Sequence, residues 1–323
     1  MRVLITGGMG VMGAEASRKF VNEGHRPVLY SRSRDDKLIH DIVDRVDIEL
    51  GDILDLPRLL QVIKKHQVTH IVHLAAFIGA VSQSNPALSV QVNVTGMVNV
   101  LEAARLFDIK RVVYTSAKGV YGPVTGEHTH PTYKPLDEDY PKNPIRIYDS
   151  AKLMGEHAGI YYQKNLGVDV VVLRFAFTYG PGKTARHGPM GVTSKLVENP
   201  YQGLPFTLPA GAEQKDDFIY NKDSALGIYL ACIAQNPKSR IYNIGSGVGS
   251  TLADFARAVR HRLPKAQIDI GPGLNFLGLP YCPHGIYDIS RARQELGFEP
   301  QYDIESGVAD YVESLRRLEA RTT

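Results

Sequence analysis

The sequence is poor in cysteine, in net charge and in long apolar runs. Its two cysteines, Cys232 and Cys282, lie far apart and form no CxxC pair. This argues against a disulfide framework or a cysteine-based zinc site and favours a reduced, cytoplasmic setting. No apolar run approaches the roughly 18 residues of a membrane-spanning helix. The first expected strand begins almost at Met1, so we expect no signal peptide and no membrane partner.

The charge is too small and too dispersed to indicate a nucleic-acid partner. The formal net charge of the 323 residues is +3, and lysine and arginine form no long run. Hydrophobic residues make up 43% and charged residues 22%, the usual balance of a globular protein. The length suits one large domain with a smaller lobe.

Short apolar runs alternate with longer amphipathic segments over the first 175 residues. This pattern is typical of an α/β fold in which helices cover a parallel sheet. Strands are expected at 2–6, 27–31, 46–50, 69–74, 110–116 and 168–174. Helices are expected at 11–23, 56–65, 86–107 and 145–165. The alternation predicts a doubly wound sheet whose ligand lies beyond the carboxyl ends of the strands.

The alternation stops after residue 176, where glycine and proline become frequent. A helix at about 222–234 and a strand at 240–245 are expected to rejoin the sheet. Further helices are expected near 251–263, 290–296 and 304–319. We therefore assign residues 1–175 and about 215–247 to the sheet domain. Residues from about 176–214 and 248–323 are expected to form a smaller, substrate-binding cap.

A glycine-rich loop joins the first strand to the first helix. Gly7 allows the tight turn, Gly10 lets the backbone approach a pyrophosphate, and Gly13 lets the helix pack on the strand. The pyrophosphate would meet the unpaired amides at the helix start, at Val11 and Met12. The glycine spacing alone is weak evidence for dinucleotide binding. Its place between a strand and a helix at the head of an alternating fold predicts a Rossmann-type dinucleotide-binding domain.

The end of the second strand bears on the choice between NAD and NADP. An NAD-binding domain usually carries a carboxylate there, which accepts hydrogen bonds from the ribose diol. Here Ser31 takes that place, and Arg32, followed by Ser33, can pair with a 2′-phosphate. This favours NADP. NAD stays possible, because Arg32 and Arg34 are alternatively loop charges balanced by the next two aspartates. Contacts to the adenine and the pyrophosphate are expected from Asp52, Ile53, Leu74, Ala75 and Ala76.

Tyr148 and Lys152 stand four residues apart and so share one face of a helix. A free phenol has a pKa near 10, and proton transfer near neutrality needs that pKa to fall by about 3 units. A neighbouring ammonium and a positively charged nicotinamide both act in that direction. Lys152 would also hold the nicotinamide ribose. We predict that this pair handles the proton of the reaction.

With these motifs, the sequence resembles the extended short-chain dehydrogenase/reductase family, which includes sugar-nucleotide epimerases and dehydratases. The resemblance covers nearly the whole chain. It also rests on Asn93 to Gly96, on Ser116 to Gly122, on Tyr179 to Gly182, on Asp217 to Tyr220 and on Leu296 to Pro300. It implies that Asn93 supports the active site. It also implies a homodimer through the helices at 86–107 and 145–165.

Two positions depart from the family's catalytic pattern. Ala117 stands where the family carries a catalytic Ser or Thr. Three interpretations stay open: Ser116 takes over, the enzyme works without the hydroxyl, or Ala replaces a natural Ser. Ser116 can take over only if the backbone turns, because neighbouring strand residues face opposite sides. Lys118 and Gly119 replace the acid pair of the family's dehydratases, so a dehydratase is not expected.

Two more departures concern the substrate. Phe177 stands where sugar-nucleotide enzymes usually have Asn, and Asp216 stands where they usually have an Arg that binds the diphosphate. An aspartate there would repel a diphosphate, and Lys215 compensates only if it reorients. Lys183 and Arg186, with His187, either meet a smaller anionic or polyhydroxylated substrate or are solvated loop charges.

We therefore expect an NAD(P)-dependent oxidoreductase that acts on a carbonyl or alcohol carbon of a small polar molecule, sugar-like or a hydroxy acid. One alternative is an epimerase, in which the hydride returns to the other face of the substrate. Another is a non-catalytic dinucleotide sensor, favoured by the missing hydroxyl at Ala117. No set of histidines has metal-ligand spacing, and no metal is expected.

Overall fold

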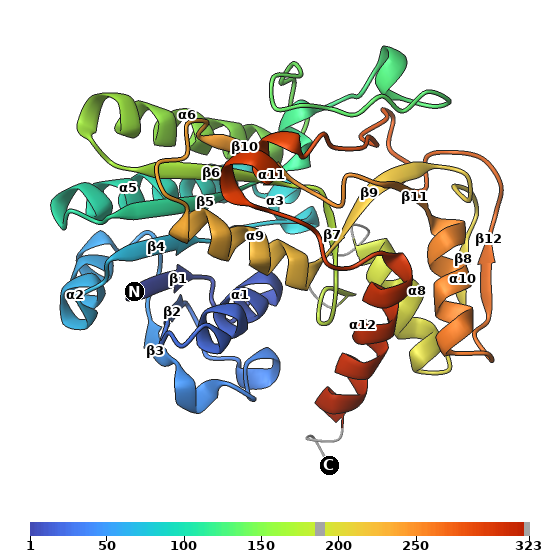
Figure 1. The fold of residues 1–323 in the computed structure, drawn as a ribbon, viewed down its shortest axis with the longest axis horizontal. Coiled ribbons are helices and arrows are strands. Elements are labelled where there is room, and N and C mark those ends of the chain that lie inside the picture. Colours follow the sequence, from blue (N-terminus) through green and yellow to red (C-terminus); the bar gives the residue numbers. More distant parts are fainter. Residues whose placement is uncertain (185–190, 320–323) are drawn as a thin grey trace.

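The computed structural model describes residues 1–184 and 191–319. A parallel sheet of seven strands runs through the larger lobe in the order β10-β6-β5-β4-β1-β2-β3 (Figure 1). Its strands are β1 (Val3–Thr6), β2 (Val28–Ser31), β3 (Asp47–Leu50), β4 (His70–His73), β5 (Arg111–Ala117), β6 (Val170–Phe175) and β10 (Ile241–Ile244). All seven were expected from the sequence. The predicted α/β, doubly wound class is confirmed.

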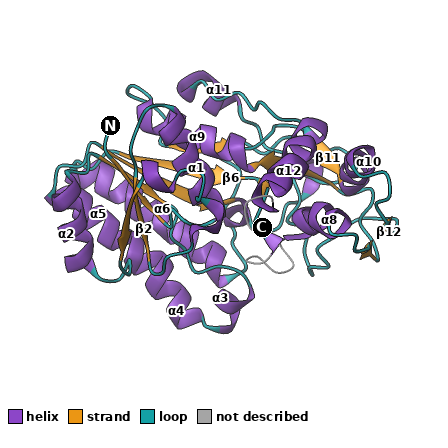
Figure 2. Cartoon of the chain, turned by 90° about the horizontal axis from the view of Figure 1, so that it is seen from below, coloured by secondary structure: helices purple, strands orange, loops and turns teal. Residues whose placement is uncertain are grey.

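The central strands are apolar because helices cover both faces of the sheet. All residues of β1 and β6 are buried, and both strands are rich in valine, leucine and isoleucine. One face packs against α1 (Val11–Asn22), α9 (Asn221–Ile233) and α11 (Ser290–Leu296), as Figure 2 shows. The other face packs against α2 (Leu56–His66), α5 (Gly96–Leu106) and α6 (Ile147–Leu166). Residues that alternate along each strand therefore feed two separate cores.

The helix expected at 86–107 is built from three consecutive segments. α4 (Pro86–Val90) leads into a π-helical segment, η3 (Gln91–Thr95), and α5 completes the run. A short helix that the sequence did not indicate, α3 (Ala80–Ser84), precedes them. π-helical segments inside α-helices occur frequently at functional sites. Asn93 lies within this one.

The smaller lobe contains two small sheets that the sequence pattern did not reveal. One has the order β11-β9-β7, from β11 (Gly249–Thr251), β9 (Lys215–Tyr220) and β7 (Phe177–Tyr179). The other pairs β8 (Phe206–Leu208) with β12 (Ile268–Ile270). Three helices pack with them: α8 (Val192–Tyr201), α10 (Leu252–Arg262) and α12 (Ile304–Glu319). Because β9 pairs with β7, the chain rejoins the large sheet at α9 and not at residue 215.

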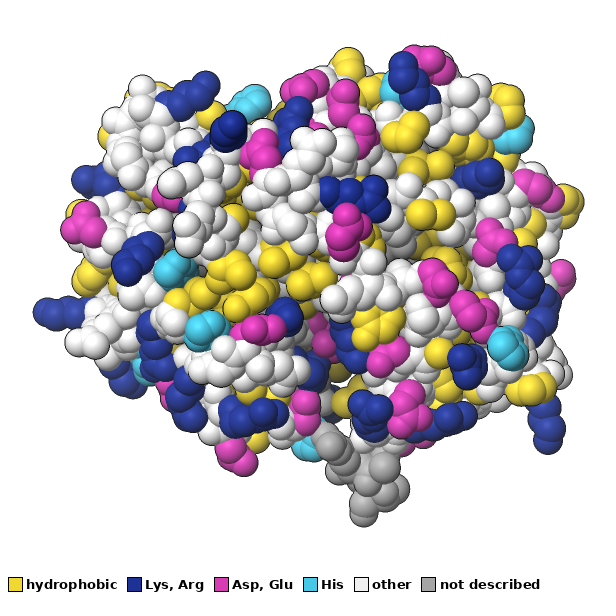
Figure 3. Space-filling view, in the orientation of Figure 1, with side chains coloured by type: hydrophobic (Ala, Val, Ile, Leu, Met, Phe, Trp, Pro, Cys, Tyr) yellow, Lys and Arg dark blue, Asp and Glu magenta, His cyan; other side chains and the backbone are white. Residues whose placement is uncertain are grey.

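The strand order reverses at β1, which lies between β4 and β2. The connections leave the sheet in opposite directions at this switch point, and a doubly wound sheet is expected to bind its ligand beyond the carboxyl ends of the two strands there, β1 and β4. The glycine-rich loop follows β1, and Leu74 to Ala76 follow β4. None of the helices in the described ranges is long and apolar enough to cross a membrane. On the face drawn in Figure 3, charges of both signs are interspersed.

Candidate functional site

The glycine-rich loop has the close contacts that only glycine allows. Gly7 has a φ of +70°, and a Cβ there would lie 2.9 Å from the Ala75 nitrogen. A Cβ on Gly13 would lie 2.1 Å from the Gly7 carbonyl oxygen. The turn is closed by the Gly10 amide, which donates to the Gly7 carbonyl at 2.9 Å. The loop thus packs backbone against backbone between β1, β4 and α1.

The N-terminus of α1 fits the pyrophosphate of a dinucleotide. The N-cap residue is Gly10, and because glycine has no side chain, it leaves the first amides of the helix without a side-chain cap. The first turn carries no acidic residue. Because unpaired amides and the helix dipole favour an anion, the segment from Gly10 to Gly13 can hold a phosphate group without displacing a protein ligand.

Asn93 holds the loop that follows β4. Its side-chain oxygen accepts a hydrogen bond from the Phe77 amide at 2.8 Å, and its nitrogen donates to the Phe77 carbonyl at 2.9 Å. Closer to the strand, the Ala75 amide donates to the Thr6 hydroxyl at 3.2 Å. Leu74, Ala75 and Ala76 are half-buried and line this edge of the sheet. Asn93 therefore positions backbone beside the expected cofactor.

The loop after β2 leaves one arginine unpaired. Arg34 pairs with Asp36 at 2.7 Å, whereas Arg32 is exposed and pairs with no carboxylate in the described part of the chain. Ser31 is half-buried and Ser33 exposed at the same edge. The sequence suggested that nearby aspartates balance both Arg32 and Arg34, and the described structure contains such an ion pair at Arg34.

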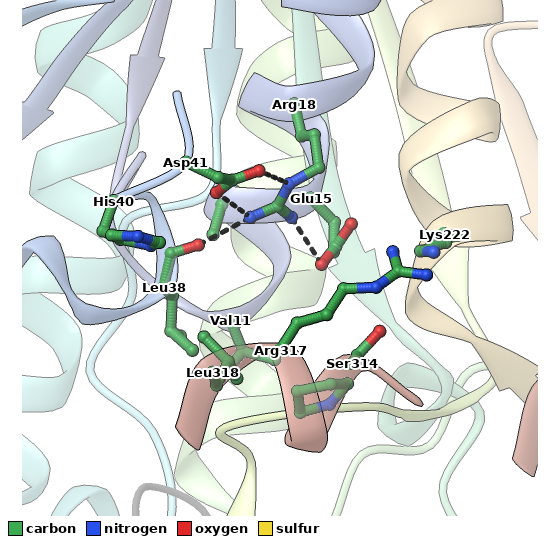
Figure 4. Close-up of a pocket in the computed structure, with 12 residues that line it drawn as sticks. Val11, Glu15, Arg18, Leu38, His40, Asp41, Lys222, Ser314, Arg317 and Leu318 are labelled. Carbon is green, nitrogen blue, oxygen red and sulfur yellow. Dashed lines mark hydrogen bonds and ion pairs between the residues drawn. The ribbon is translucent and has the colours of Figure 1, made fainter. Parts of the chain in front are cut away.

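Arg18 fixes this loop against α1 (Figure 4). Its guanidinium donates to Asp41 at 2.8 Å, to the Leu38 carbonyl at 2.8 Å and to Glu15 at 2.6 Å. Leu38 in turn contacts Gly182, in the segment that follows β7. The loop thus spans from the large lobe to the start of the small one.

Two residues after β3 lie where the adenine contact was expected. Asp52 accepts a hydrogen bond from the Leu54 amide at 2.9 Å, and its carbonyl accepts one from the Tyr30 hydroxyl. Ile53 is buried against Gly96 at the start of α5. These contacts hold the turn at the carboxyl end of β3.

Tyr148 and Lys152 lie in the first two turns of α6. The Lys152 amine is buried, donates to the Thr115 carbonyl at 2.7 Å, and lies 5.7 Å from the centre of the Tyr148 ring. Tyr148 is half-buried, and its hydroxyl makes no hydrogen bond to any residue that the structure describes. The phenol is therefore available to a substrate, while a backbone contact fixes the amine.

The pKa values of this pair differ from the sequence-based expectation. Burial raises the pKa of Tyr148, and the neighbouring Asp149 raises it further, while Arg146 lowers it. Burial also lowers the pKa of Lys152 to about 7, although Glu156 opposes this effect. A buried amine that is partly neutral near pH 7 supplies less positive charge than a solvated one. Lys152 alone does not make the phenol acidic.

The Ser116 hydroxyl already has a hydrogen-bond partner on the face of the sheet that α6 covers. It donates to Glu156 at 2.5 Å, and Glu156 forms a buried ion pair with Arg174 at 2.6 Å. The neighbouring Ala117 is half-buried and ends β5. To act on a substrate, Ser116 would have to leave Glu156.

Asp216 belongs to a buried charge cluster. Its carboxylate forms an ion pair with Lys118 and accepts a hydrogen bond from His284 Nδ1 at 2.8 Å. Lys118 also donates to the Gly285 carbonyl at 2.6 Å. The expected compensating residue, Lys215, is exposed, with its amine 5.9 Å from the Tyr133 ring. Lys118 therefore neutralises Asp216 and His284 hydrogen-bonds it, a pairing that their separation in the sequence did not indicate.

Phe177 and Lys183 lie together at the start of the small lobe. The Lys183 amine lies 5.1 Å from the centre of the Phe177 ring and donates to the Thr178 carbonyl. Phe177, Phe218 and Phe276 form an aromatic wall, with ring centres 5.6–6.1 Å apart. The Phe276 ring also contacts His284 at 4.3 Å. The wall thus links Lys183 to the Asp216 cluster. Arg186 and His187 lie outside the described residues.

Sequence reasoning located the loop and the Tyr148–Lys152 pair, and it missed the groups that surround them. His284, Arg146 and the pairing of Lys118 with Asp216 had no local signal. Among residues 1–184 and 191–319, no three His, Cys, Asp or Glu side chains lie close enough to hold a metal ion.

The chain is similar in sequence and in fold to known proteins over nearly its whole length. The sequence profile of the NAD dependent epimerase/dehydratase family matches residues 3–245. A UDP-glucose 4-epimerase of Mycolicibacterium smegmatis is 28% identical over 98% of this chain and 99% of its own. The Thermus thermophilus UDP-glucose 4-epimerase, solved with NAD, is 25% identical, with a TM-score of 0.81 over 98% of this chain and 99% of that one. A GalE-like L-threonine dehydrogenase from Cupriavidus necator shares the fold, with a TM-score of 0.82 and 24% identity over 98% and 100% of the two chains.

Proposed function

Because the chain belongs to the NAD dependent epimerase/dehydratase family, we propose that it transfers hydride between a nicotinamide dinucleotide and a carbonyl or alcohol carbon of a small polar substrate. Tyr148 exchanges the proton with the substrate oxygen. One observation carries the proposal: the Tyr148 hydroxyl has no hydrogen-bond partner in the described chain, although it stands beside a fixed buried amine. A hydroxyl left free in this position is available for proton transfer.

The residues present fit a dinucleotide. The uncapped N-terminus of α1 suits the pyrophosphate, and the tight packing at Gly7 and Gly13 brings backbone to that position. When bound, the nicotinamide supplies the group that accepts or donates hydride. Lys152 is held by the Thr115 carbonyl and has further N–H groups for a ribose hydroxyl. NADP is the proposed form, because Arg32 is the exposed and unpaired cation at the end of β2 in the described chain.

The proton chemistry follows from the burial of Tyr148. Its raised pKa keeps the phenol protonated near neutral pH, so it is ready to donate a proton to an oxygen that gains negative charge. Arg146 opposes this rise, and its guanidinium is held by Asp149 at 2.8 Å.

The test is the change in absorbance of free reduced nicotinamide with a panel of polar carbonyls and alcohols. Tyr148→Phe should lower the rate by about 10²- to 10⁴-fold, the usual contribution of a positioned acid. Tyr302→Phe, at a half-buried tyrosine just before α12, is the control and should leave the rate unchanged. An unaltered rate in the Tyr148 variant would exclude this role.

An epimerase is the second candidate, because one relative that matches 98% of this chain at 28% identity is a UDP-glucose 4-epimerase. In that case the hydride returns to the substrate and free cofactor shows no net turnover. Product analysis by proton NMR with the cofactor-loaded enzyme separates the two. Interconversion of sugar stereoisomers without cofactor consumption would favour the epimerase.

We also propose a cytoplasmic homodimer through α4, α5 and α6. On α6, Met154 and Tyr161 are 55% and 60% exposed, seven positions apart and therefore on one face. Val90 and Leu106 add exposed apolar surface on the neighbouring segments. Light scattering of the purified protein should give twice the mass of one chain, and a single-chain mass would count against the dimer. Both cysteines are free, and free cysteines suit a reducing compartment.

A further inference from the structure

Most cations around the candidate site are already neutralised by carboxylates. Lys118 pairs with Asp216, and Arg146 pairs with Asp149. Arg174 pairs with Glu156 in the core of the large lobe. A nucleoside diphosphate carries at least two negative charges and needs free cations or several N–H donors to bind. These three pairs offer it no free cation.

Two buried amines of the described chain differ from these cations: Lys152, which the Thr115 carbonyl holds beside Tyr148, and Lys183. The Lys183 side chain is 9% exposed, and no carboxylate of the described chain pairs with it. Its protein contacts are the Thr178 carbonyl and the face of the Phe177 ring. A buried cation without a counter-charge is costly, so its presence indicates a ligand that supplies the negative charge.

The neighbouring polar groups point to the same ligand. The side-chain hydroxyls of Thr184 and Thr193 are buried and have no hydrogen-bond partner. Thr193 lies in the first turn of the ten-residue helix α8, which has no side-chain cap and no acid in its first turn. The Lys183–Thr184 backbone packs beside Gly191, the N-cap residue of this helix. The backbone of Lys183 and Thr184 thus lies beside the N-terminus of the helix that carries Thr193, and no carboxylate of the described chain pairs with the Lys183 amine.

We propose that Lys183, with the Thr184 and Thr193 hydroxyls, binds the carboxylate of a small monoanionic substrate, such as a short hydroxy or oxo acid. The inference rests on the proposed hydride transfer and names its substrate class. Phe177 lies two residues beyond β6, so this anchor stands at the carboxyl edge of the sheet, where the reacting carbon is expected. The aromatic wall packs against the uncharged part of the substrate. One buried cation matches one carboxylate and leaves a diphosphate undercompensated.

The test measures binding by calorimetry on the cofactor-loaded protein. The probes are short 2- and 3-hydroxycarboxylates, the uncharged amide of each, and UDP. We expect each carboxylate that binds to do so at least about tenfold more tightly than its amide, as a charge-assisted contact requires. Lys183→Met should reduce carboxylate affinity to the level of the amide. Lys195→Met, on a half-buried lysine of α8, is the control and should change nothing.

Equal binding of carboxylates and amides would overturn the inference, and so would UDP binding more tightly than every carboxylate, or carboxylate binding unchanged in Lys183→Met. The comparison of carboxylates with amides and the comparison with UDP both use the unmodified chain, so they remain informative even if the Lys183 variant fails to fold. Turnover of reduced nicotinamide, measured in parallel, distinguishes a failure of the carboxylate anchor from a failure of the proposed hydride transfer. Turnover that is indifferent to substrate charge rejects the carboxylate anchor alone. An absence of turnover with every carbonyl and alcohol rejects the proposed hydride transfer, while the binding arms still decide on the anchor.

Discussion

Lys118 and Asp216 form a buried ion pair that joins the end of β5 to the small lobe. Each residue, considered singly, departs from its family's pattern. In the structure the two departures compensate each other. The cation at 118 neutralises the anion at 216, and His284 occupies the second carboxylate oxygen. The pair thereby removes from the site the charges that each residue would bring alone.

Asp216→Asn should destabilise the fold by about 3–5 kcal/mol, because it leaves Lys118 buried without a counter-charge. Adding Lys118→Met should recover a large part of that loss, since the double variant no longer buries the cation without its ion-pair partner. Urea unfolding followed by circular dichroism measures both. A double variant less stable than Asp216→Asn alone would show that the pair is not coupled in this way.

Lys183→Met should stabilise the protein while it weakens ligand binding. Burial lowers the pKa of Lys183 from 10.5 to about 7, so below pH 7 the folded state carries a buried charge. Between these values the unfolded chain binds a proton that the folded chain does not, and wild-type stability rises with pH. The variant should therefore be more stable by about 2–4 kcal/mol below pH 7, with the difference shrinking towards pH 10.5. Urea unfolding at several pH values tests this. A destabilised variant at low pH would indicate a structural lysine.

Gly13→Ala should reduce both stability and dinucleotide binding. The added Cβ would lie 2.1 Å from the Gly7 oxygen, and overpacking of this kind costs about 1–3 kcal/mol. Dinucleotide affinity should fall at least about tenfold, because the shifted backbone loses a contact to a charged group. Gly10→Ala is the contrast: its Cβ would lie 3.1 Å from the same oxygen, so it should cost less stability than Gly13→Ala. Thermal unfolding and calorimetry report on both variants.

Arg32→Ala should weaken NADP binding by about 10- to 100-fold, the value of one hydrogen bond to a charged group, and leave NAD binding unchanged. Arg34→Ala is the matched control, because Arg34 is held by Asp36. Dissociation constants for both dinucleotides decide the matter. Equal losses for NAD and NADP would show that Arg32 does not contact a 2′-phosphate.

Much of the large lobe is predictable from sequence because parallel strands buried on both faces leave continuous apolar runs. The seven strands were found this way, and the glycine loop was found from the spacing of its glycines between a strand and a helix. The strands of the small lobe, such as β7 and β11, have three residues each and leave no periodic signal. The partners of Asp216 come from segments about 70 to 100 residues away, and the pKa of Tyr148 depends on burial that the sequence does not contain.

The π-helical segment around Asn93 sets a condition on the length of the chain. Each residue of a helix turns the next side chain by about 100°. Deleting one residue between Gln91 and Thr95 would restore a regular helix and would rotate Asn93 away from the Phe77 backbone or Gly96 away from Ile53. Redesign of this helix must therefore keep the extra residue, even though an ideal helix would be more stable by itself.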